Sequence, residues 1–126
     1  MSFATDLSHI MSADTSLNSY CNGGINYENL PENFDLTKNW IVYTFNKTSQ
    51  DSCLGSDAAI MRYTVVIKIL SPSTETLETI NDHIVNYLNG KSYNGIKDFL
   101  FTSDNHTLDM EKRVYMNTLQ FNVLYA

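Results

Sequence analysis

Basic residues are scarce in this sequence and unevenly placed. Eight Lys and Arg stand against 14 Asp and Glu, a net charge of −6, and residues 1–37 contain no Lys or Arg at all. A general nucleic-acid-binding surface needs clustered Lys and Arg, so this class of function is excluded. The acids of the first segment form either a solvated surface that aids solubility or one deliberately negative face of an assembly. They are Asp6, Asp14, Glu28, Glu32 and Asp35.

Cysteine and long apolar runs are also scarce. Cys21 and Cys53 are the only cysteines and lack metal-type spacing, so we expect free thiols in a reducing compartment. No stretch approaches 18 apolar residues, which predicts no membrane span. The opening "MSFATDLSHI" has neither a basic n-region nor a long apolar run, so we expect no signal peptide.

Catalytic motifs are missing too. The sequence has no Gly-rich phosphate loop, G-x-S-x-G, H-E-x-x-H or C-x-x-C, so we predict no enzyme activity and no cofactor. The three histidines are scattered, and His83 is expected to be a half-buried structural side chain. Four acidic and histidine side chains between residues 104 and 111 could bind a cation through carboxylate oxygens and an imidazole nitrogen. A solvated turn between two strands explains these polar residues equally well. They are Asp104, His106, Asp109 and Glu111.

The 126 residues, 43% of them apolar, suffice for a single domain over residues 1–126 with one core. Helical spacing predicts an amphipathic helix over residues 2–13, capped by Ser2. A second helix is predicted over residues 71–90, with Ser71 as the cap and Gly90 as the stop.

Alternating apolar residues predict the strands. The segments at 39–46 and 60–70 form a hairpin joined by a long polar loop, residues 47–59. A possible edge strand precedes them, and two more strands follow, joined by a polar connection. These other segments are "INYENL", "DFLFTS" (98–103), "SDNHTLDMEK" (103–112) and "RVYMNTLQFNVLYA" (113–126). The order predicts an α+β fold: a single, mostly antiparallel β-sheet of four to five strands with two helices packed on one face.

Aromatic residues make up 12% of the chain, and several fall in the predicted strands. Aromatic side chains suit strands and fill cores. Alternatively, a sheet face or edge meets another subunit, where Tyr and Trp are common. On the second interpretation the candidate interface residues are Trp40, Tyr43, Tyr63, Tyr115 and Tyr125.

The order of these elements resembles the tail-terminator and tail-completion (neck) proteins of tailed bacteriophages. The resemblance rests on the N-terminal helix, "NWIVYTF", the polar loop, "RYTVVIKIL", the helix "ETINDHIVNYLNG" and the closing "LQFNVLY". It extends over nearly the whole chain but is carried by hydrophobic pattern more than by an invariant motif.

This resemblance implies a structural virion protein of the tail and neck, assembled in the host cytoplasm. Such proteins form a ring, sixfold or twelvefold, that contacts the tail tube protein and a head-completion or connector protein. DNA passes through the lumen without specific binding, and no membrane is involved. By position, the loop at 47–59 would line the lumen, with Gln50, Asp51 and Asp57 as candidate wall residues.

Other functions fit the same pattern. A head–tail connector or adaptor ring is the nearest alternative, because fold does not fix function. A small cytoplasmic protein-binding module or host-directed inhibitor belongs to a different class, and an enzyme is the most distant alternative.

Overall fold

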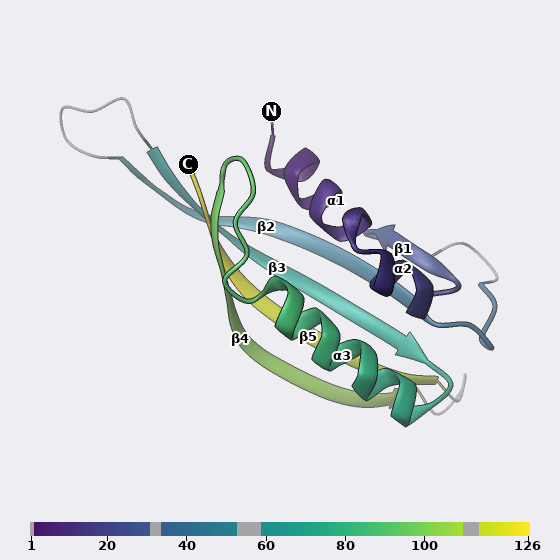
Figure 1. The fold of residues 1–126 in the computed structure, drawn as a ribbon. Helices are drawn as coiled ribbons and strands as arrows, with labels where there is room; N and C mark the ends of the chain where they lie inside the picture. Colours follow the sequence, from purple (N-terminus) through teal and green to yellow (C-terminus); the bar gives the residue numbers. More distant parts are fainter. Residues whose placement is uncertain (1, 31–33, 53–58, 110–113) are drawn as a thin grey trace.

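The computed structural model describes residues 2–30, 34–52, 59–109 and 114–126. A five-stranded sheet in the order β1-β2-β3-β5-β4 carries the helices α1 and α3 against one of its faces (Figure 1). The elements are α1 (Phe3–Ala13), α2 (Thr15–Tyr20), β1 (Gly24–Tyr27), β2 (Trp40–Ser52), β3 (Ala59–Ser71), α3 (Thr74–Leu88), β4 (Ile96–Asp109) and β5 (Val114–Tyr125).

The sheet confirms the predicted fold class. Neighbouring strands from β2 through β3 and β5 to β4 are antiparallel, and only the short β1 lies parallel to its neighbour β2. The N-terminal helical region contains α1 and, after Asp14, the separate six-residue helix α2, so the described chain has three helices where the sequence predicted two.

Alternation along the strands builds the core. In the middle of β3 and β5 every second residue, such as Ile67 and Phe121, is fully buried beneath the helices. The apolar stripe of α3 covers these strands, and α1 adds a second row. The helix residues of this core are Phe3, Leu7, Ile10, Met11, Leu17, Leu77, Ile80, Ile84 and Leu88.

Two strands are longer than predicted. Strand β2 continues to Ser52, so the first part of the predicted loop at 47–59 belongs to a strand: Gln50 lies opposite Met61 and Asp51 opposite Ile60. Strand β4 likewise continues to Asp109, where a polar connection was predicted. Polar residues form these strands because the ladder hydrogen bonds come from the neighbouring strand and need no apolar face. Asp57 lies outside the described residues.

The helix caps agree with the prediction at α1 and differ at α3. The Ser2 hydroxyl accepts from the Thr5 N–H, as predicted. At α3 the cap is Ser73, two residues later than predicted. Ser71 is instead the last residue of β3, fully buried, and its hydroxyl donates to the Asn39 side chain. Gly90 follows the helix with φ of 81°, the left-handed conformation expected of a stop.

Candidate functional site

The five aromatic residues predicted to face another subunit lie on both faces of the sheet. Tyr43 is only 7% exposed and belongs to the core under the helices, with Tyr63, Tyr115 and Tyr125 packed half-buried against that core. Trp40, 8% exposed, lies on the opposite face. The structure therefore brings Tyr63 and Tyr125 together, 6.1 Å between ring centroids, but does not gather all five into one surface.

Trp40 anchors the segment that precedes β2. Its indole N–H donates to the Asp35 carbonyl at 2.8 Å, and the Phe34 ring meets it edge to face. A Cβ on Gly23 would lie 2.4 Å from the indole, so only glycine permits this close approach. The Trp40 side chain therefore makes these contacts within its own chain.

Phe3, at the start of α1, joins an aromatic cluster on the core face. Its ring stacks on Tyr63 with centroids 3.9 Å apart and meets Tyr125 edge to face at 5.4 Å. Phe45 completes the cluster at 5.0 Å from Phe3. These rings fix the first turn of α1 over the ends of β3 and β5.

The end of β5 is held by a buried carboxylate. Asp6, 1% exposed, accepts from the Tyr125 hydroxyl at 3.0 Å and from the Asn94 amide at 3.3 Å. Burial, together with hydrogen bonding to Asp6, raises the pKa of the Tyr125 hydroxyl. The Ala126 N–H donates to the Gly95 carbonyl at 2.9 Å. Tyr125 and Ala126 are therefore bound within their own subunit.

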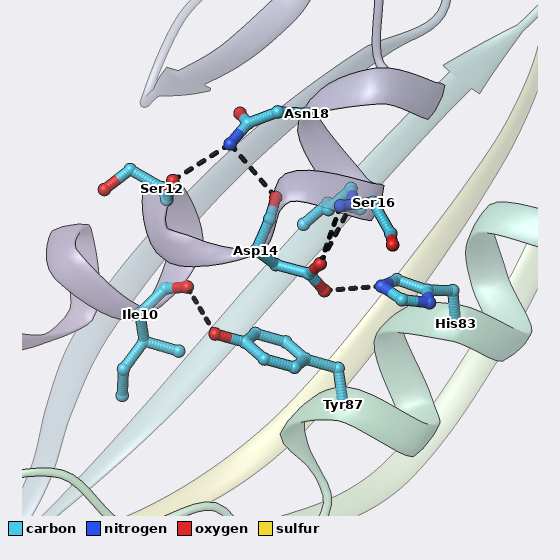
Figure 2. Close-up of polar contacts among 8 residues, drawn as sticks. Ile10, Ser12, Asp14, Ser16, Asn18, His83 and Tyr87 are labelled. Carbon is cyan, nitrogen blue, oxygen red and sulfur yellow. Dashed lines mark hydrogen bonds and ion pairs between the residues drawn. The ribbon is translucent and has the colours of Figure 1, made fainter.

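Asp14 and His83 join the N-terminal helices to α3 (Figure 2). The His83 Nε2 lies 2.5 Å from one Asp14 oxygen, while the other oxygen accepts the N–H groups of Ser16 and Leu17. Burial acts to raise the pKa of the Asp14 carboxyl, but the hydrogen bonds from His83 and Leu17 outweigh it and the pKa lies below its usual value. His83 is 28% exposed, which agrees with the half-buried structural role expected of it.

A second contact lies beside this pair. The Tyr87 hydroxyl donates to the Ile10 carbonyl at 2.9 Å, one turn along α3 from His83 (Figure 2). Burial, with the nearby Asp14 charge, raises the pKa of the Tyr87 hydroxyl. The side chains of His83 and Tyr87 both link α3 to the N-terminal helical region, so this cluster has the geometry of a structural contact between helices.

A further surface, which the sequence patterns did not predict, lies on the helix-free face of the sheet. Here a shallow groove of about 300 Å³ is bordered by Arg62, Leu100 and Leu124. Leu100 is 56% exposed and Leu124 38%. The register places Arg62, Leu124 and Asp98 in one row across three strands. The alternation in "DFLFTS" could have indicated Leu100, because Phe99 and Phe101 point to the core.

The described helices carry acidic residues and no basic ones. Exposed Glu75, Glu78 and Asp82 lie on α3, and none of the described helices contains Lys or Arg. The helix-free face of the sheet presents Arg62 and Lys68 together with Asp98. Among the acids of residues 1–37, Asp6 is buried and Asp14 is paired, so that segment is only partly an exposed negative surface.

The candidate cation ligands lie along an extended strand. Asp104 and His106 belong to β4, with 3.7 Å between the His106 Nε2 and an Asp104 oxygen. Glu111 lies outside the described residues. Within the described ranges, no group of three His, Cys, Asp or Glu side chains could hold a metal ion. None of the described helices is long and apolar enough to cross a membrane.

Fold and surface together define an α+β protein whose described helices pack against one face of the sheet. Neither a family model nor a curated protein matches the sequence. Among solved structures, the fold is similar to a chain in "Virion of native gene transfer agent (GTA) particle", with a TM-score of 0.71. The match extends over 98% of this chain and 93% of the other at 13% identity, which establishes likeness of fold.

Proposed function

We propose that this chain is a structural protein of a tailed, phage-like particle. In this role it forms a ring at the head–tail junction, ends the tail tube and joins the tube to the head connector. The observation that carries the proposal is the fold likeness to a chain in a gene transfer agent virion, which extends over nearly the full length of both chains. The order of elements, which resembles the phage tail-terminator proteins, supports the same role.

The arrangement of polar side chains supports a role without catalysis. Asp14 with His83, and Asp6 with Tyr125, are the pairs in which an acid–base or nucleophilic function would be sought. Each joins two elements of the fold, and Asp14 also caps α2. The proposed role therefore depends on contacts between protein surfaces and not on a reaction centre.

The proposed partners are further copies of the chain, the tail tube protein and a head-completion or connector protein, with DNA passing through the lumen. We assign the hairpin of β2 and β3, with Gln50, Asp51 and Asp57, to the channel wall. An acidic wall repels DNA phosphates and keeps the passing duplex from binding. The acidic residues of α3 offer a second negative surface for the same purpose.

Removing the chain from a cell that produces the particles tests this role. We expect complete heads and tails that fail to join, with tails of uncontrolled length. Supplying the chain again with the exposed substitution Thr79→Ala restores joined particles and serves as the control. Normal joined particles without the chain would exclude the role, whereas unjoined tails of normal length would favour an adaptor ring on the head side.

A further inference from the structure

The two edges of the sheet are protected to different degrees. At one edge, the short β1 pairs with β2 only from Trp40 to Tyr43, so the rest of β2, residues 44–52, has β3 on one side and no described strand on the other. In Figure 1 the last residues of β2 and the first residues of β3 extend beyond the helices. At the other edge, β4 is the outermost strand along its whole length.

Part of the β4 edge is already covered. The Phe99 carbonyl accepts from the Gly90 N–H at 2.8 Å, and the Phe101 N–H donates to the Asn89 side chain at 3.2 Å. A register shift between Phe101 and Ser103 follows. Beyond it, residues 103–109 pair with β5 without interruption, and residues 103–107 are all exposed.

This remaining stretch has few of the features that prevent strand addition. Native edges are usually short, bulged, or protected by Lys and Pro. Residues 103–109 contain neither Lys nor Pro, and their register with β5 has no bulge. An extended segment of another chain can therefore pair with this edge through main-chain hydrogen bonds.

We propose that residues 103–109 of β4 receive residues 44–52 of β2 from a second copy of this chain, so that the sheet continues from subunit to subunit. The direction of the strands favours this pairing. Strands β2 and β5 are parallel and β4 is antiparallel to both, so a copy in the same orientation, placed beside the first and shifted along the strands, brings residues 44–52 of its β2 antiparallel to residues 103–109 of β4. Antiparallel pairs are slightly more stable per residue than parallel pairs.

Charge favours this head-to-tail contact over pairing of two β4 edges. Residues 103–109 carry Asp104 and Asp109 and no Lys or Arg, so two such edges would bring four acids together. Residues 44–52 carry Lys47 with Asp51, and their formal charge is balanced. A head-to-tail contact uses a different patch on each side of the subunit and closes into a ring. Ring closure is the part of this inference that rests on the proposed function.

Cross-linking of single-cysteine variants tests the contact. One full-length variant carries Asn46→Cys on β2, and a second, distinguishable by a tag, carries Asn105→Cys on β4; both carry Cys53→Ser. Cys21 is retained, because its burial raises the pKa of the thiol to about 12 and leaves it unreactive at neutral pH. A short bismaleimide is added to each variant alone and to their mixture.

We expect cross-linked dimers in the mixture at a yield on the order of tenfold above that of either variant alone, because pairing raises the local thiol concentration. Thr79→Cys, on the exposed surface of α3, replaces Asn105→Cys in the matched control and should give only the background yield. Dimers from Asn105→Cys alone would overturn the proposal in favour of paired β4 edges. Dimers from Asn46→Cys alone would overturn it in favour of paired hairpins.

Assembly is followed in the same samples by light scattering. A ring that forms without the mixed cross-link would overturn the strand pairing and leave the proposed role intact. Monomers at every concentration, with no mixed cross-link, would also overturn the pairing. The proposed role is tested independently by removing the chain from producing cells, so the two failures are distinguishable.

Discussion

At the level of single residues, Asp14 contributes to two contacts at once. It caps α2, and its side chain hydrogen-bonds to His83 on α3. Alanine at this position removes both contacts and should lower the free energy of unfolding by about 1–2 kcal/mol, as for other lost caps. Asn keeps the capping oxygen and loses the charge, so Asp14→Asn should cost less. Chemical denaturation of the two variants at pH 7 measures the difference.

The pH dependence of this stability follows from the lowered pKa of Asp14. A carboxyl with a lowered pKa in the folded state stabilises the fold above its unfolded pKa, and that contribution is lost as the pH falls through the folded pKa. The part of the difference in unfolding free energy between the wild type and Asp14→Asn that comes from the Asp14 charge should therefore be lost as the pH falls below about 4. A difference that persists unchanged in acid would contradict the ion pair.

Tyr125 gives a second prediction at this scale. Tyr125→Phe leaves the buried Asp6 carboxylate with Asn94 and without its hydroxyl donor. We expect a loss of about 1–3 kcal/mol in the free energy of unfolding, the usual cost of an unsatisfied buried group. Tyr20→Phe removes a hydroxyl from a side chain that is 39% exposed and should be nearly neutral. Equal effects of the two substitutions in thermal melts would contradict the role of Asp6.

Neither of these residue pairs could be predicted from the sequence. Asp6 and Tyr125 are 119 positions apart in the sequence, and Asp14 and His83 are 69 positions apart. Periodicity indicated where the helix at 71–90 and the closing strand at 113–126 lie, and the structure has α3 and β5 there. It carries no information on which polar side chains meet across the core, because that depends on how helices and strands are placed relative to one another.

Among the elements, α3 contributes most directly to the core over β3 and β5. Ile84 is fully buried in that layer. Ile84→Ala should lower the free energy of unfolding by about 2–5 kcal/mol, the range for large-to-small core substitutions. Thr79→Ala on the exposed side of the same helix is the matched control and should change stability little. Urea titrations followed by circular dichroism measure both, and a small effect of Ile84→Ala would contradict the packing of α3.

The ends of elements were harder to predict than their existence. Residues 47–52 and 103–109 are polar and lack the alternation that identifies a half-buried strand, yet they pair in β2 and β4. Their strand conformation comes from neighbouring backbone rather than from burial of their own side chains. The cap of α3 was misplaced for a related reason: Ser71 is a sound cap by type, but β3 extends through it.

At the scale of the whole molecule, the described residues form one sheet face covered by helices, a second face without a described helix, and two edges of different kinds. The sequence predicted the layers correctly but not which surfaces remain available. Four of the five predicted interface aromatics lie on the helix-covered face and Trp40 is covered from the other side, so these side chains present little area to a neighbour. Whether a helix covers a given sheet face depends on tertiary packing, which strand alternation does not encode.

Electron cryo-microscopy of particles from a cell that makes this chain tests the proposed role most directly. The account predicts density for this five-stranded fold repeated six or twelve times around the particle axis, at the junction of head and tail, in contact with the last ring of the tail tube. Particles in which this fold lies elsewhere, or from which it is absent, would contradict the account.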